Sequence, residues 1–284
     1  QAAEFDGWTA FDAILGPPPV DTGRMAVGDS KKVYQAGGSL DRLETTVLAF
    51  LQLCGFRPLC LAELYEVLSG VTGCALGDTP WCQGNGLSLP RTAESDSVAC
   101  FADRWSRRCD ELGVGRPLVG ATVLTADTYN RALEATDNKA VVLSQSSLEL
   151  LAGLVDPDAE ESTFALADKH GGRNRYGGLL CEAFGDRLVM PIQEGAACSR
   201  YRLGSLEVTF EVRAERHFPV ALASMVAKYT RELAMEAFND FWATACPGIR
   251  PTRGYPVDAC RFRDEVGDRL KELRISPDAF WRRR

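Results

Sequence analysis

The chain has 284 residues with a formal net charge of −7, and 45% of them are hydrophobic, which is ordinary for a globular protein. No apolar run approaches the roughly 18–20 residues that cross a bilayer, and the first residues lack a signal-peptide pattern, so we expect a cytoplasmic protein without a membrane span. The ten cysteines include no Cys-x-x-Cys pair, which favours free, reduced thiols over a zinc site.

The first half of the chain is predicted to be mainly helical. A short helix from Phe11 to Leu15 is expected to end at the proline-rich connector 16–19. Ser39 can cap a helix running from Leu40 to about Leu53, whose leucines and valine recur at helical spacing. Residues 70–96, rich in Gly, Pro, Ser and Thr, are predicted to be irregular. The elements expected next are a helix at Val98–Leu112, a strand at Leu118–Leu124 and helices at Ala126–Ala135 and Asn138–Leu154.

The second half is predicted to supply a sheet. Thr163–Ala167 is a short apolar run that Asp168 ends, and it follows an acidic loop. Three later runs alternate in polarity as an antiparallel meander does. We expect these strands at Arg187–Ile192, Ser199–Leu203 and Leu206–Val212, with helices at Tyr176–Phe184, Pro219–Phe241 and Ala259–Leu273.

Two carboxylates are candidates for a metal site. Asp168 ends one strand, and Glu215 is expected at the end of another, just before the helix that starts at Pro219. Ligands of open α/β sheets collect beyond the carboxyl ends of the strands. The alternative for Glu215 is a surface acid without a function.

Basic residues gather in three places although the chain is acidic overall. A basic rim around an acidic centre suits a phosphodiester substrate, because the scissile phosphate meets metal while its neighbours meet Arg and Lys. The alternative is a set of solvated loops. The three clusters are residues 169–175, 250–263 and 282–284.

Five segments, in this order, resemble type 2 ribonuclease H (ribonuclease HII). The helical segment differs from the family motif Ala-Ser-Ile-Leu-Ala-Lys-Val-Thr-Arg-Asp by conservative changes and by its final Glu. The resemblance covers residues 24–55 and 118–284. The segments are Asp29-Ser30-Lys31-Lys32, the strand-end Asp168, the helix from Ala223 to Glu232, Gly254-Tyr255-Pro256, and Ser276-Pro277 with the Arg-rich end.

The resemblance implies a fold, an activity and a metal requirement. The fold would be α/β, a ribonuclease H-like mixed sheet flanked by helices on both faces. The activity would be metal-dependent endonucleolytic hydrolysis of the RNA strand of an RNA–DNA hybrid, or cleavage at ribonucleotides embedded in a DNA duplex. The family holds two Mg²⁺ or Mn²⁺ ions on four carboxylates, which suits hard oxygen ligands. Asp168 would match the third carboxylate, and Glu215 stands where the family has its last Asp.

Substrate-binding residues follow from the same resemblance. Tyr255 would match the tyrosine that stacks under the ribose next to the scissile bond and helps to sense the 2′-hydroxyl; the alternative is a half-buried loop aromatic. The other candidates are Lys31, Lys32 and Lys228, which match basic family positions near the hybrid backbone, and Ser30, which could also donate to phosphate. We add Arg173 and Arg175 because they lie close to Asp168 in the sequence.

The sequence also departs from the family. Nothing before Asp29 matches the Gly-x-Asp-Glu-Ala-Gly strand that supplies the first two carboxylates. We therefore expect a chain whose first strands are missing, which lacks about 40 upstream residues of a hairpin, binds metal poorly and does not turn over hybrid; a complete protein is expected to be a monomer. Two other functions stay open, a non-catalytic ribonuclease H-like protein that binds nucleic acid and an unrelated metal-dependent phosphoesterase. The predicted domains are an N-terminal remnant at 1–55, an irregular and helical insertion at 56–117 and a ribonuclease H-like core with C-terminal helices at 118–284.

Overall fold

A computed structural model describes residues 5–21, 23–35, 38–70, 79–82 and 86–283. Its elements form one four-stranded mixed sheet, one two-stranded sheet and a majority of helix, so the predicted α/β class is confirmed. Part of the irregular segment 70–96, the Cys74 thiol and Gly37 lie outside the described residues. The cysteines that are described are all free, as predicted. None of the helices in these ranges is both long and apolar enough to cross a membrane.

The larger sheet contains the predicted meander. Its strand order is β3-β6-β5-β4, with β3 parallel to β6 and the other two pairings antiparallel. The register pairs Asp168 with Glu211, so two acidic residues end neighbouring parallel strands. The bounds are β3 Thr163–Asp168, β4 Met190–Glu194, β5 Cys198–Leu203 and β6 Leu206–Glu211.

Helices cover one face of this sheet. Helices α7 (Lys139–Leu154) and α8 (Gly177–Ala183) pack Leu148 and Leu180 in one core with the inward residues of β5 and β6. On the opposite face Phe164 is 65% exposed and Met190 is 57% exposed. The expectation of helices on both faces is therefore wrong for the described residues.

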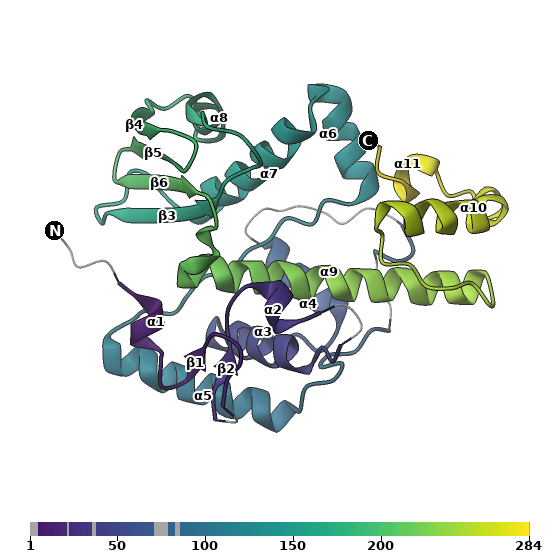
Figure 1. Cartoon of the computed structure of the whole chain (residues 1–284), viewed down its shortest axis with the longest axis horizontal. Helices are drawn as coiled ribbons and strands as arrows, with labels where there is room; N and C mark the ends of the chain where they lie inside the picture. Colours follow the sequence, from purple (N-terminus) through teal and green to yellow (C-terminus); the bar gives the residue numbers. More distant parts are fainter. Residues whose placement is uncertain (1–4, 22, 36–37, 71–78, 83–85, 284) are drawn as a thin grey trace.

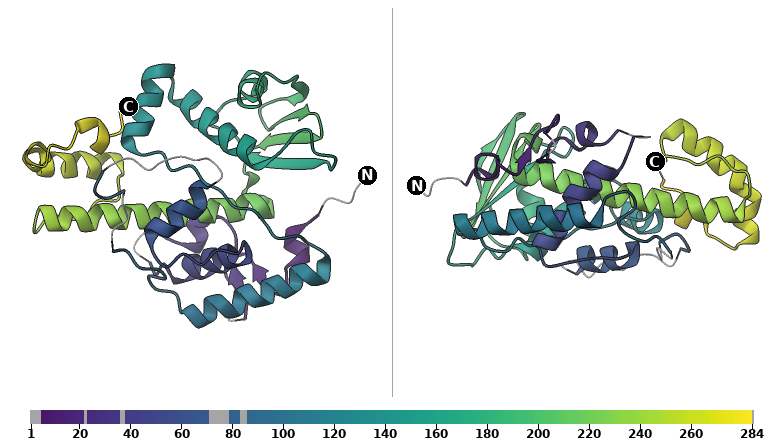
Figure 2. Two further views of the ribbon diagram at one scale, coloured as in Figure 1. Left: turned by 180° about the vertical axis from the view of Figure 1, so that it is seen from behind. Right: turned by 90° about the horizontal axis from the view of Figure 1, so that it is seen from below.

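The N-terminal helices form a second core beneath helix α9, which crosses the middle of the molecule between them and the sheet (Figures 1 and 2). Apolar side chains of α9 at positions 221, 225, 229 and 233 enter this core. The elements of this layer are α1 Gly7–Ala10, β1 Leu15–Gly16, β2 Met25–Ala26, α2 Ser30–Val33, α3 Asp41–Leu53, α4 Leu61–Ser69, α5 Ser95–Leu112 and α9 Phe218–Ala245.

The C-terminal part packs on the far end of α9. Trp242 of α9 is fully buried with Phe262 and Val266 of helix α10 (Pro256–Glu272). The short helix α11 (Pro277–Phe280) then returns toward helix α6 (Ala126–Thr136) (Figure 1).

Two local predictions were wrong, and one helix was not predicted. The first helix is α1, because the Asp6 carboxylate accepts hydrogen bonds from the backbone of Trp8 and Thr9 and starts the helix before Phe11. Residues 118–124 form no strand; they run as an extended connector whose Ala121 N–H donates to Leu68 in α4. Helix α4 itself lies in the segment predicted as an insertion, where only one helix was expected.

A buried carboxylate ties the N-terminal layer to α9. Glu44 of α3 is completely buried, and its Oε1 accepts from Arg91 N (2.8 Å) and the Tyr229 hydroxyl (2.6 Å). Its Oε2 accepts from Thr92 N (2.6 Å), Thr92 Oγ1 (3.2 Å) and Ala93 N (2.8 Å). Buried charge is stable only when it is hydrogen-bonded in this way. Glu44 therefore fixes the loop at residues 91–93 against α3 and α9.

Candidate nucleic-acid interface

The two predicted carboxylates are linked through the turn that precedes α9. Asp168 ends β3, and its Oδ1 accepts a hydrogen bond from Ala214 N at 3.0 Å. Glu215 directly follows Ala214 in a 3₁₀ turn, η1 (Ala214–Arg216), that leads into α9. The prediction that Glu215 ends a strand is wrong, because β6 already ends at Glu211 and the chain then turns through Arg213 at φ +59°.

The strand-end acid that sequence reasoning missed is Glu211. It lies opposite Asp168 in the sheet register and is bonded to the Arg216 guanidinium and, at 2.8 Å, to His217 Nε2. The hydrogen bond from His217 and the charge of Arg216 lower the pKa of Glu211. Its charge is therefore neutralised by its own neighbours.

A divalent metal would need more ligands than this turn provides. Among the residues that the structure describes, no three His, Cys, Asp or Glu side chains come together in an arrangement that could hold a metal ion. One carboxylate oxygen of Asp168 already accepts a hydrogen bond from Ala214 N, and one of Glu215 already accepts from Ser224 Oγ. The described residues thus do not fit the two-ion centre that the sequence resemblance implies.

Two of the motif segments meet side by side. Ser224 Oγ on α9 donates to Glu215 Oε1 at 2.8 Å and lies 3.0 Å from Ser30 Oγ on α2. Further along the same two segments, Lys228 Nζ lies 5.4 Å from the centre of the Tyr34 ring. Ser224 and Lys228 lie four residues apart on α9 and share a face of that helix, whereas Tyr34 is the extended residue that follows α2. The contacts 30/224 and 34/228 therefore place the segment 30–34 beside one face of α9.

The N-terminus of α2 exposes two lysines beside this surface. Asp29 caps the helix by accepting from Lys31 N at 2.9 Å. Lys31 and Lys32 are exposed, and neither forms an ion pair with any of the described carboxylates. Both are therefore available to a partner.

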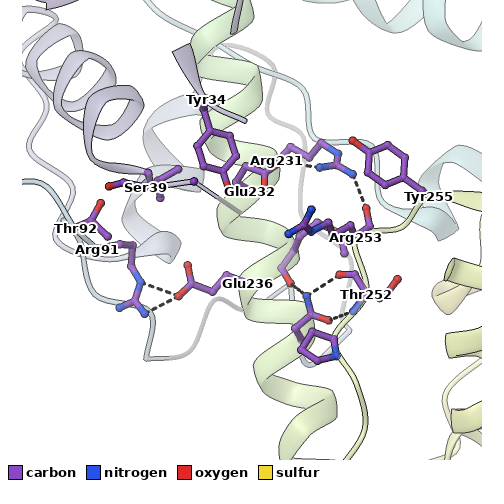
Figure 3. A pocket seen from close by; sticks show the side chains of 15 residues that line it. Tyr34, Ser39, Arg91, Thr92, Arg231, Glu232, Glu236, Thr252, Arg253 and Tyr255 are labelled. Atoms are coloured by element: carbon purple, nitrogen blue, oxygen red, sulfur yellow. Dashed lines mark hydrogen bonds and ion pairs between the residues drawn. The ribbon is translucent and has the colours of Figure 1, made fainter. Parts of the chain in front are cut away.

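A cavity of about 530 Å³ continues the surface along α9 (Figure 3). Arg231 lies on its wall, where it donates to Arg253 O at 2.8 Å and bonds Glu232 at 2.9 Å. The Arg231 guanidinium is 5.9 Å from the ring centre of Tyr255, a cation–π distance. Tyr255 is 56% exposed, so most of its ring is accessible from solvent. Tyr34 and Arg231 were not predicted as site residues, although both belong to or adjoin the quoted motifs.

Another wall of the cavity comes from the loop at residues 91–93, which Glu44 holds against α3 and α9. Arg91 points into it and forms an ion pair with Glu236 at 2.6 Å, while Thr252 is bonded to Asn239 (Figure 3). These contacts fix the wall before any ligand arrives, which is the preorganisation that binding sites need.

Arg173 and Arg175 lie apart from this cavity. They belong to the loop after β3, which the buried Lys169 holds by donating to Asn174 Oδ1 at 2.9 Å and to Ser199 Oγ at 3.1 Å. Arg175 is highly exposed and lies 3.5 Å from Glu194. Neither arginine lines the cavity, so the structure groups them with the sheet edge and Asp168.

Comparison of the chain with protein-family models, with curated proteins and with solved structures gives no significant match.

Proposed function

We propose that the chain binds an RNA–DNA hybrid, or a DNA duplex that contains ribonucleotides, through one surface along α2 and α9. We call this the α2–α9 surface, and its residues are Ser30, Lys31, Lys32, Tyr34, Lys228, Arg231 and Tyr255. The observation that carries the proposal is the matched pair of contacts, Ser30 with Ser224 and Tyr34 with Lys228. It brings together two segments that lie almost 200 residues apart in the sequence.

The chemistry of this surface suits a nucleic-acid backbone. Lysines and arginines contact phosphates, and Lys31 and Lys32 are exposed for such contacts, while the buried Ser30 bonds Ser224 beneath them. Along the surface the cations Lys31, Lys32, Lys228 and Arg231 outnumber the carboxylates Asp29, Glu215 and Glu232, although Lys228 and Arg231 both pair with Glu232. The local positive charge therefore differs from the net charge of −7 of the chain.

Tyr255 supplies the element that would distinguish ribose from deoxyribose. An exposed ring beside a guanidinium can stack on a sugar or base, and its hydroxyl can reach a 2′-hydroxyl. The resemblance to ribonuclease HII at Gly254-Tyr255-Pro256 assigns this same role. The ribonuclease H-like identity of the sheet is part of the proposal.

Hydrolysis of the RNA strand is the second candidate function. It is favoured by Asp168, which accepts from the turn residue Ala214, and by its neighbour Glu215, which Ser224 links to Ser30. We assign no hydrolytic step to a metal ion, because the described residues do not form a site of three ligands. Mg²⁺ and Mn²⁺ are the ions to add in the assay.

Fluorescence anisotropy with three labelled duplexes of one sequence tests the proposal. The duplexes are an RNA–DNA hybrid, a DNA duplex with one ribonucleotide and an all-DNA duplex. Binding without added metal, with the two ribose-containing duplexes preferred, supports the proposal. Lys228→Gln is expected to weaken binding to all duplexes and to lower the salt slope by about 1. Tyr255→Ala is expected to weaken the ribose-containing duplexes by roughly 5- to 100-fold.

The matched control is Lys271→Gln. Lys271 is 81% exposed on α10 and does not belong to the α2–α9 surface. An equal loss of duplex affinity in Lys271→Gln and Lys228→Gln would show that only the net charge of the chain matters and would contradict the proposal.

A cleavage assay on the same duplexes tests the second candidate function, hydrolysis of the RNA strand. Products in Mn²⁺ that disappear in Asp168→Asn would establish hydrolysis. Cleavage of all three duplexes alike would instead favour the unrelated phosphoesterase, which has no use for a 2′-hydroxyl.

A further inference from the structure

A second cavity lies behind the first, between α9, α10, α11 and the start of α6. Its volume is about 410 Å³, within the roughly 300–1,000 Å³ of small-molecule sites. It adjoins the α2–α9 surface only through Arg231, Met235 and Thr252, which line both cavities. Seven aromatic side chains line it: Tyr65, Trp81, Tyr129, Phe238, Phe262, Phe280 and Trp281.

Four of these rings, Trp81, Phe238, Phe262 and Phe280, belong to the aromatic core around Trp242, and the side of this core that borders the cavity forms its walls. The Trp81 ring lies 5.2 Å from that of Phe238, and the nearly parallel Phe262 and Phe280 rings are 6.4 Å apart. Trp81, Phe238 and Phe280 are only partly buried. Their accessible surfaces therefore face the cavity, where a flat ligand can stack on them.

The charge at the rim has one sign. The lining residues include Lys139, Arg231, Arg282 and Arg283 and contain no aspartate or glutamate. Arg231 and Arg283 are already paired with acids. Within the described part of the chain, Lys139 and Arg282 have no carboxylate partner, and Arg282 lies 5.1 Å from the centre of the Tyr129 ring. Two cations at the mouth of an aromatic cavity are complementary to an anion.

A buried amide fixes this mouth. Asn130 of α6 is 2% exposed, and its Nδ2 donates to Asp278 O at 3.0 Å and Trp281 O at 2.8 Å. Its Oδ1 accepts from Arg283 N at 2.8 Å. The segment that carries Trp281 and Arg282 is therefore held over the cavity by three hydrogen bonds.

We propose that this cavity binds a planar aromatic anion of the nucleotide class, with the base between the aromatic walls and the phosphate at Lys139 and Arg282. A neutral aromatic compound would leave the cations without a counter-charge, and a non-aromatic phosphate would leave the walls exposed to water. This site shares Arg231 with the α2–α9 surface, but its proposed phosphate-binding cations Lys139 and Arg282 lie outside that surface, and it does not depend on duplex binding.

Titration of the whole chain with AMP and with GMP, followed by tryptophan fluorescence and calorimetry, tests the proposal. Trp81 and Trp281 line the site, so a stacked base is expected to quench their emission. The expected order is nucleoside monophosphate tighter than adenosine, and adenosine tighter than ribose 5-phosphate. Saturable binding of AMP or GMP in this order supports the site, and equal binding of ribose 5-phosphate would overturn it.

Two kinds of variant locate the ligand. Lys139→Gln and Arg282→Gln are each expected to weaken AMP about tenfold, whereas Lys271→Gln outside the cavity leaves AMP affinity unchanged. Ala259→Leu fills the cavity from α10 and is expected to abolish quenching without loss of the fold, which circular dichroism checks.

The outcomes separate this site from the proposed function. Lys139→Gln is expected to retain hybrid binding, because Lys139 lies outside the α2–α9 surface. Failure of both nucleoside monophosphates to bind at millimolar concentration, or tighter binding of a saturated fatty acid than of either nucleotide, would overturn the inference while leaving duplex binding untouched.

Discussion

Replacing Glu44 with glutamine keeps the size of the side chain and changes one oxygen into an NH₂ group. All five partners of the carboxylate are donors: three backbone N–H groups and two hydroxyls. An amide offers only one acceptor atom, so its NH₂ must face at least two of these donors. The smaller loss places NH₂ at the Oε1 position, where Arg91 N loses its acceptor and the Tyr229 hydroxyl, which can turn to accept from the NH₂, no longer donates to a charged oxygen.

The magnitude follows from those two lost bonds. Hydrogen bonds to a charged group contribute about 1.5–3 kcal/mol each, so two of them amount to roughly 3–6 kcal/mol. Removing a buried charge returns part of this, because the desolvation cost of the carboxylate disappears. We expect Glu44→Gln to lower the free energy of unfolding by about 2–4 kcal/mol.

Urea denaturation followed by circular dichroism and tryptophan fluorescence measures the change. Burial raises the pKa of Tyr229, so its hydroxyl stays protonated as a donor, and Tyr229→Phe is the natural partner variant. The double variant is expected to be less destabilised than the sum of the single variants, because both remove the same bond. Glu236→Gln, which breaks only the partly exposed pair with Arg91, is the control and is expected to cost less than about 1 kcal/mol. A Glu44→Gln midpoint equal to that of the control would refute the reasoning.

Three further predictions concern the stability of the fold. Gly204 has φ +55°, and a Cβ there would lie 2.3 Å from Pro157 O, whereas Gly171 has φ +60° with open space around it. Gly204→Ala is therefore expected to lower the free energy of unfolding by more than the roughly 1–2 kcal/mol expected for Gly171→Ala. Urea denaturation compares the two variants, and equal costs would contradict the close approach of Gly204 to Pro157. Burial and the charge of Arg173 lower the pKa of His170, so the unfolded chain binds more protons than the folded chain as the pH drops through and below the ordinary value of 6.5. The free energy of unfolding therefore falls as the pH falls in this range, and His170→Gln is expected to flatten that slope between pH 7 and 5.5. An unchanged slope would show that another group is responsible. Asn130→Ala removes three hydrogen bonds of about 1 kcal/mol each, so limited proteolysis is expected to cleave off the C-terminal segment faster in this variant than in the unmodified chain. The control is Asn138→Ala, which changes the exposed N-cap of α7. Equal cleavage rates in the two variants would contradict the anchoring role of Asn130.

Periodicity in the sequence predicted most of the regular structure. The alternation from residue 187 to 212 gave the three meander strands, and the capping Asn138 and the apolar spacing behind it placed α7. Leu118–Leu124 has the composition of a strand but no neighbour with which to form a ladder. Its conformation depends on tertiary contacts that no local pattern contains.

The candidate site was predictable only where motifs were already recognised. Ser30 and Lys228 were proposed with the resemblance, and the structure places Ser30 against Ser224 and Lys228 beside Tyr34. The contact of Lys228 with Tyr34 depends on how α2 and α9 align, which spacing in the sequence does not specify. Glu215 was placed at a strand end because the sequence could not show that β6 stops four residues earlier. The Glu44 network joins residues 44, 91–93 and 229, and a lone Glu on an apolar helix face gives no local signal of its partners.

Anisotropy of the RNA–DNA hybrid against the all-DNA duplex of the same sequence, at one salt concentration and with the unmodified chain, tests the central claim most directly. The account predicts tighter binding of the hybrid and loss of that preference in Tyr255→Ala. Equal affinity for both duplexes in the unmodified chain, or a preference that survives in Tyr255→Ala, would contradict it.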